Sequence, residues 1–140
     1  MMGGPVSVPL NRRFASNGER IYYTGVSATT GPIPRTGGPT WVYRTGVGCV
    51  ACHGVHGRGG VPIMMGTAVP EDIQYNVLTG KAPEPGGEKM DHPPYTDATL
   101  KRAVIEGVDP AGESLDWTMP RWHLTDEDWA NLLIYLKSLR

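Results

Sequence analysis

The chain contains the stretch Cys49-Val50-Ala51-Cys52-His53, which holds both of its cysteines. Two thiols separated by two residues and followed directly by a histidine have the spacing of covalent haem attachment. At this spacing the sulfurs can reach the two vinyl groups of one porphyrin, and the histidine is held below the ring with a nitrogen directed at the iron. Gly48 and Gly54 flank the stretch and allow the backbone to approach such a ring closely. The stretch therefore predicts one covalently bound haem, with His53 as an iron ligand.

Two other kinds of site could use the same cysteines. A disulfide or a thioredoxin-like dithiol would pair them, but that motif belongs near a βαβ unit, and the flanks here indicate a glycine-rich loop. A zinc site could use Cys49, Cys52, His53 and His56. Four ligands so close in sequence crowd a tetrahedron, and no second pair of ligands follows downstream. Haem attachment is therefore favoured over both alternatives.

The composition indicates that side chains alone fill the core poorly. Among 140 residues there are 19 Gly and 13 Pro, and both residue types interrupt regular secondary structure. A loop-rich chain with one Phe and a hydrophobic fraction of 39% has little apolar surface with which to offset its ordering entropy. A porphyrin, which is large and mostly apolar, would supply the missing core.

Charge and hydropathy exclude some classes of partner. The formal charge is −1, with 13 basic and 14 acidic residues, so a nucleic-acid partner is not expected. No stretch approaches the roughly 18–20 apolar residues that cross a bilayer. The start, Met1-Met2-Gly3-Gly4-Pro5, lacks the basic and apolar regions of a secretion signal. We expect either a chain that is not exported or one given without its export signal or anchor, and the haem motif favours the second.

Helical spacing and end signals predict three helices within a single domain of residues 1–140. The last helix has the clearest signals, because Thr125 is a good N-cap, the first turn is acidic and Asp128 occupies the capping-box position. Thr96 caps the helix before it, and Gly107 ends that helix. The predicted helices cover approximately residues 17–23, 96–106 and 125–139.

Strand signals are weak, and one long connection stands out. Trp41-Val42-Tyr43 could form a short extended piece. Residues 24–45 are rich in Gly, Pro and Thr and are expected to form an inserted surface loop. The alternative for this insertion is a flap that docks a partner or covers the haem.

These pieces, in this order, resemble the class I c-type cytochromes, particularly the bacterial single-haem domains. The similarity extends over about residues 17–139, apart from the insertion. Gly18 and Tyr22 look like the glycine and aromatic residue of that family's first helix, and Leu132 and Tyr135 look like their partners on its last helix. The resemblance implies the mostly α cytochrome c fold, with long Gly/Pro-rich loops around one haem c. It also implies that the first and last helices cross closely at the glycine.

The resemblance assigns the haem ligands as well. It implies thioether bonds at Cys49 and Cys52, with His53 as one axial ligand of the iron. The family places the other ligand, a methionine, in an extended segment before the last helix, often followed by proline, and Met119 fits this position. In the family a proline carbonyl accepts a hydrogen bond from the free nitrogen of the ligating histidine, and Pro62 is the candidate here. Ligation by histidine and methionine raises the reduction potential.

Other residues compete with Met119 or surround it. His123, four residues further along, is the main alternative ligand and would lower the potential. Tyr95, Trp117 and Trp122 flank the methionine segment and are expected to form flat walls against the haem. The remaining candidates are expected to pack against the porphyrin or the core, or to lie in loops and at the surface: Met64, Met65, Met90, His56 and His92.

The resemblance implies an electron carrier that is not an enzyme in its own right and has no small-molecule substrate. One electron at a time would pass between respiratory redox proteins through the haem edge, with no open position on the iron. Two alternatives stay open: an electron-entry domain of a larger membrane oxidoreductase complex, and a haem sensor or peroxidase-like protein that releases the methionine. Because thioether attachment is made outside the cytoplasm, a periplasmic or outward-facing location is expected.

Overall fold

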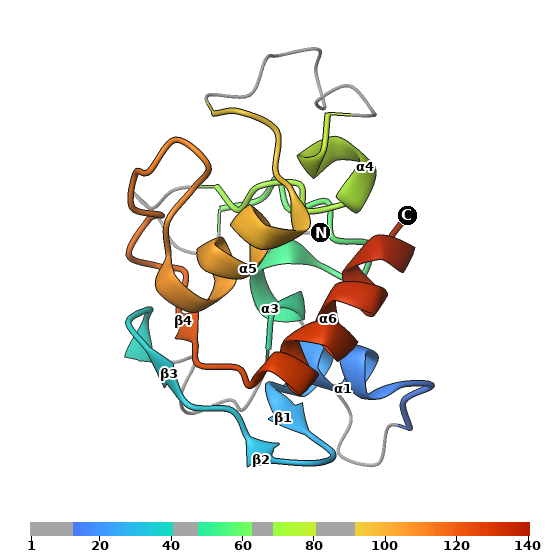
Figure 1. Ribbon diagram of the computed structural model, residues 1–140. Helices are drawn as coiled ribbons and strands as arrows, with labels where there is room; N and C mark the ends of the chain where they lie inside the picture. Colours follow the sequence, from blue (N-terminus) through green and yellow to red (C-terminus); the bar gives the residue numbers. More distant parts are fainter. Residues whose placement is uncertain (1–12, 41–47, 63–68, 81–91) are drawn as a thin grey trace.

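Helices dominate the part of the chain that the computed structural model describes, which is residues 13–40, 48–62, 69–80 and 92–140 (Figure 1). The helices are α1 (Asn17–Thr24), α3 (Val50–His53), α4 (Tyr75–Leu78), α5 (Asp97–Glu106) and α6 (Asp126–Ser138). The strands are two residues long: β1 (Val26–Ser27), β2 (Gly31–Pro32), β3 (Arg35–Thr36) and β4 (Arg121–Trp122). The prediction of a mostly α fold is confirmed. The extended piece expected at residues 41–43 lies outside the described residues.

The three predicted helices begin and end close to the expected residues because local capping fixes their ends. The side chain of Thr96 accepts a hydrogen bond from the backbone N–H of Thr99 at the start of α5, and Gly107 ends that helix with φ 73°. The side chain of Thr125 accepts from the N–H of Asp128 at the start of α6. The short helices α3 and α4 were not predicted. None of the helices in the described part has both the length and the apolar character needed to cross a bilayer.

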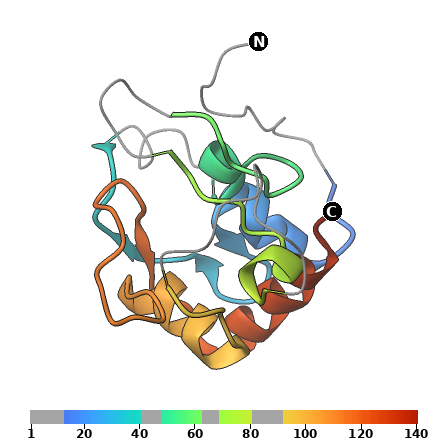
Figure 2. The same cartoon turned by 90° about the horizontal axis from the view of Figure 1, so that it is seen from above.

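Helices α1 and α6 cross at Gly18, and Figures 1 and 2 both show them side by side. A Cβ atom at Gly18 would lie 2.1 Å from the backbone oxygen of Asn131 in α6. One turn along each helix, the rings of Tyr22 and Tyr135 have centroids 5.2 Å apart. The crossing predicted from Gly18, Tyr22, Leu132 and Tyr135 is therefore confirmed, and Leu132 is only 1% exposed.

The segment predicted as an insertion pairs with the chain around β4. Strands β1 and β2 form one antiparallel pair, and β3 pairs with β4 so that Arg35 lies opposite Trp122. The backbone N–H of Gly38 donates to the carbonyl of Trp117 (3.0 Å), and the N–H of His123 donates to the carbonyl of Pro34 (2.8 Å). Residues 34–38 thus cover the outer side of the segment that contains Met119.

Asp128 connects the start of α6 to the turn after β1. Its side chain is buried, with 1% of the residue exposed. Its carboxylate accepts hydrogen bonds from Ser27 Oγ (2.7 Å), from Thr30 Oγ1 (2.6 Å) and, more weakly, from Asn17 Nδ2 (3.5 Å). The sequence analysis placed Asp128 only in a local capping pattern, so this long-range network was missed.

Replacing Asp128 by asparagine is expected to lower the free energy of unfolding at pH 7 by about 2 kcal/mol, because a charged acceptor of several buried hydrogen bonds is lost. Burial alone would raise the pKa of Asp128, but the hydrogen bonds outweigh it and hold the pKa below its usual value. The stabilisation is therefore present above the unfolded-state pKa of about 4 and is lost as the pH falls through the lower folded-state pKa.

Urea unfolding of the wild type and of Asp128→Asn, at neutral and acidic pH, measures this difference. Asp126→Asn is the matched control, because Asp126 lies in the same helical turn but is exposed. The contact described for its carboxylate is an ion pair with Lys101 Nζ. Asp126→Asn should change the stability little. A difference for Asp128→Asn that does not shrink in acid would contradict the network.

Candidate functional site

An apolar pocket is lined by residues of α3, α5 and α6. Figure 1 shows α3 between α5 and α6. The empty space of the pocket, counted together with solvent-open space at its mouth, is about 1220 Å³. Its walls come from α5, α6 and the segments that flank β4 and α4. The apolar residues that line it include Ile73, Leu78, Tyr95, Leu100, Ala103, Val104, Leu115, Trp122, Leu132 and Leu136. Tyr95 and Trp122 line the pocket as expected, whereas Trp117 is 59% exposed.

Helix α3 places the three residues of the sequence motif at this pocket. Cys49 precedes α3, Cys52 and His53 lie within it, and all three line the pocket. Gly48 also lines the pocket, and it has a further role, because a Cβ atom there would lie 2.6 Å from the carbonyl oxygen of Ile21 in α1. The missing side chain thus lets α3 approach α1 closely.

The imidazole of His53 is oriented by a backbone carbonyl. The Nδ1–H of His53 donates to the carbonyl oxygen of Glu71 at 2.8 Å. Because a carbonyl oxygen only accepts, Nδ1 carries the hydrogen and Nε2 keeps the lone pair that a metal ligand needs. Burial also lowers the pKa of His53, which favours the neutral ring.

The prediction that Pro62 supplies this carbonyl is wrong. Pro62 is exposed, and the loop after α3 turns back before it. Gly59 has φ 54°, and the N–H of Gly60 donates to the carbonyl of Pro70 (2.9 Å). These contacts bring the next proline along the chain, Pro70, and the adjacent Glu71 to the histidine. A proline after the motif was the expected sequence signal, and Pro70 is such a proline, but it lies further along the chain from His53 than Pro62 does.

Met119 lines the same pocket as His53. Its backbone N–H donates to the carbonyl of Asp116 (3.1 Å), and Pro120 beside it is buried. The rival ligand His123 is exposed, does not line the pocket, and has Nε2 3.1 Å from Thr36 Oγ1. Three other candidates, Met64, Met65 and Met90, lie outside the described residues.

The remaining histidines face other groups. His56 Nδ1 is 3.0 Å from the carbonyl oxygen of Arg140, and His92 Nε2 is 3.1 Å from Glu71 Oε1. Neither lines the pocket, so of the four histidines only His53 does. This agrees with the expectation that His56 and His92 belong to the surface or to loops.

The two alternative uses of the cysteines find no support. Both thiols are free, and burial raises the pKa of Cys49 to about 12 and the pKa of Cys52 to about 11. A thioredoxin-like dithiol needs the opposite shift, since its reactive form is the thiolate. Across the described ranges, no three His, Cys, Asp or Glu side chains are grouped so that they could hold a metal ion, and this includes the four residues of the proposed zinc site.

The donor groups and the walls of the pocket fit a haem. Two thiols at the attachment spacing, one imidazole with its Nδ1 already bonded, and one thioether all line a single cavity. The aromatic and aliphatic walls suit a large apolar ring, and a soft thioether with an imidazole is a recognised ligand pair for haem iron. The residues of the pocket therefore fit one haem.

Comparison with known proteins gives one match. The family model described as Cytochrome c matches residues 42–140. No curated protein and no solved structure matches the chain. The matched region contains the cysteine motif, Glu71, Met119 and α6, while α1 and the strands β1 to β3 precede it.

Proposed function

The chain belongs to the cytochrome c family, whose members bind covalently attached haem c and transfer electrons, and on that premise we propose that it carries single electrons between redox proteins. In this proposal Cys49 and Cys52 form the thioether bonds, and His53 and Met119 are the axial ligands. The observation that supports it best is that these four side chains line one apolar pocket.

The residues of the pocket would hold the haem in one fixed geometry. The haem, when bound, supplies a one-electron iron couple. The Glu71 carbonyl fixes the tautomer and orientation of His53, as a hydrogen bond to the outer nitrogen of a metal-binding histidine does in other sites. The apolar walls from α5 and α6 would shield a bound ring from water.

Two side-chain ligands, His53 and Met119, would leave the iron no open position for a substrate, so the protein would work by outer-sphere transfer. The thioether of Met119 favours the reduced state and raises the potential. Its partners would then be a donor and an acceptor protein of a respiratory chain, either free or within a membrane complex. Thioether bonds to haem are made outside the cytoplasm, so the proposal includes a periplasmic or outward-facing location for the protein.

The proposal is tested with protein made in a host that installs haem c. We expect the intact chain to gain the mass of one haem that survives denaturation, and the double variant Cys49→Ser/Cys52→Ser to gain none. The oxidised spectrum should be low-spin and contain the weak far-red band of sulfur–iron ligation. A chain without added haem would overturn the proposal, and a high-spin ferric spectrum would favour a sensor or peroxidase-like protein instead.

A further inference from the structure

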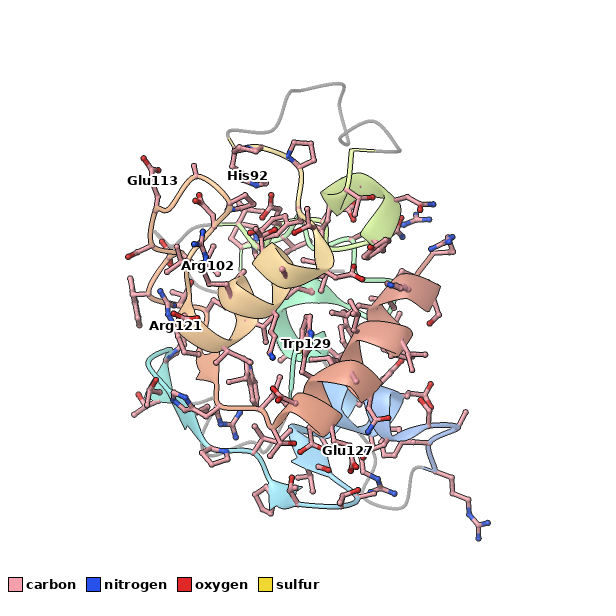
Figure 3. The ribbon with its side chains drawn as sticks, viewed as in Figure 1. His92, Arg102, Glu113, Arg121, Glu127 and Trp129 are labelled. Atoms are coloured by element: carbon pink, nitrogen blue, oxygen red, sulfur yellow. The ribbon has the colours of Figure 1, made fainter. Side chains whose placement is uncertain are left out.

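Arg121 binds the loop that carries Met119 at three points. The guanidinium Nη1 donates to the carbonyl oxygens of Asp116 (3.0 Å) and Met119, and Nη2 donates to the carbonyl oxygen of Leu115 (2.8 Å). Figure 3 shows Arg121, the first residue of β4, below Arg102, and Glu113 at the outer end of the loop between α5 and β4. Three backbone carbonyls of the segment 115–119 therefore accept hydrogen bonds from the guanidinium of Arg121.

We call Arg121 and the three carbonyls that it binds, those of Leu115, Asp116 and Met119, the arginine clamp. The end of α5 packs against the other side of this clamp. A Cβ atom at Gly107 would lie 2.0 Å from Nε and 2.5 Å from Cζ of Arg121. The side chain of Arg121 thus lies against the bare backbone of Gly107, whose carbonyl also accepts a hydrogen bond from the N–H of Leu115 (2.8 Å). A side chain at position 107 would push the guanidinium out of the place from which it reaches the three carbonyls.

The geometry favours an arginine over other cations. Three carbonyl oxygens that point at one place carry partial negative charge and would repel one another without a cation between them. A guanidinium is permanently charged and presents five donors in one plane, whereas the ammonium of lysine is a compact point charge with three. A lysine at position 121 would keep the charge but lose the planar array.

We propose that Arg121 is a positioning residue that holds the thioether of Met119 in the pocket, an inference that rests on the proposed ligation of haem by Met119. The hydrogen bond to the carbonyl of Met119 fixes the backbone of the ligand itself. The bonds to Leu115 and Asp116 fix the residues that lead to it. The clamp thus keeps the methionine in place against competing ligands of the iron.

The test uses the haem-loaded full chain and imidazole as the competing ligand. Arg121→Gln is expected to tighten imidazole binding to the oxidised protein roughly tenfold to hundredfold, the equilibrium effect of losing hydrogen bonds to a charged group. It should also weaken the far-red band, and Arg121→Lys should give an intermediate result. The matched control is Arg102→Gln, because Arg102 Nη2 also donates to a loop carbonyl, that of Asp109 (2.9 Å), but away from Met119.

A second pair of variants moves the guanidinium without replacing it. Gly107→Ala should displace Arg121 and reproduce the effect of Arg121→Gln. Gly112→Ala is its control, because Gly112 has the same unfavourable sign of φ (87°) in the same loop but nothing within 4 Å of its Cβ position. A strained backbone alone would affect both variants equally.

The outcomes separate this inference from the proposed function. A wild-type protein without the far-red band would overturn ligation by Met119, and the inference with it. A wild type that has the band, together with Arg121→Gln that binds imidazole no more tightly, would overturn the inference alone. Equal tightening in Arg102→Gln would also overturn it, because the effect would then come from general loosening of the loop.

Discussion

Replacing Gly18 by alanine is expected to destabilise the protein by about 3 kcal/mol, the upper end of the usual cost of an added buried methyl group. Helix propensity alone predicts the opposite, since alanine in a helix is favoured over glycine by roughly 1 kcal/mol. The added Cβ would lie 2.1 Å from the carbonyl oxygen of Asn131 and 2.9 Å from Cβ of Tyr135. The first is a backbone atom of α6, and the second is the first side-chain atom of Tyr135 in the same helix. Neither atom can move away by a side-chain rotation.

The effect should extend from the crossing to the pocket. Relief of the clash requires α1 and α6 to separate, and Leu132 and Leu136 of α6 line the pocket. Urea unfolding of the haem-loaded protein measures the loss of stability. Ile134→Ala is the control, since Ile134 is in the same helix but 69% exposed. A Gly18→Ala protein more stable than the wild type would show that the two helices are not in contact at this residue.

Features set by neighbours in sequence were predictable, whereas the Gly18 crossing, which joins distant residues, was predicted from the family resemblance. The ends of α5 and α6 follow from a threonine cap and, for α5, a terminal glycine, because these act within one turn. The face of α1 that meets α6 follows from the helical spacing of Gly18 and Tyr22 together with the family pattern. For the same reason the motif was enough to place Cys49, Cys52 and His53 together at one site.

Features set by distant partners were not predictable from one sequence. Strands β3 and β4 are too short for an alternating pattern, and each exists because of a partner far away in the chain, as with Arg35 opposite Trp122. The carbonyl that orients His53 depends on how a glycine-rich loop turns, which is why Pro62 was chosen and Glu71 was missed. Arg121 showed no local signal, since its acceptors are backbone carbonyls that any residue carries.

The second axial ligand was also not decided by the sequence alone, because Met119 and His123, four positions apart, were both candidates. Replacing Met119 by alanine is expected to abolish the far-red band, turn the oxidised spectrum high-spin and open the iron to imidazole. The reduction potential should fall by a few tenths of a volt, within the roughly 0.8 V range that axial ligands span. The reason is that the thioether, which favours reduced iron, is lost from the wall of the pocket.

His123→Ala is the matched control, because it removes the rival ligand from the same segment. His123 is exposed and its Nε2 is bonded to Thr36 Oγ1, so its loss should leave the spectrum and the potential unchanged. Met119→His should restore a low-spin spectrum but at a potential below that of the wild type, because a second imidazole does not stabilise reduced iron as a thioether does. If the wild type were low-spin without the far-red band, and His123→Ala but not Met119→Ala turned the oxidised spectrum high-spin, the ligand would be His123, and the chain around β4 would have to turn over when the haem binds.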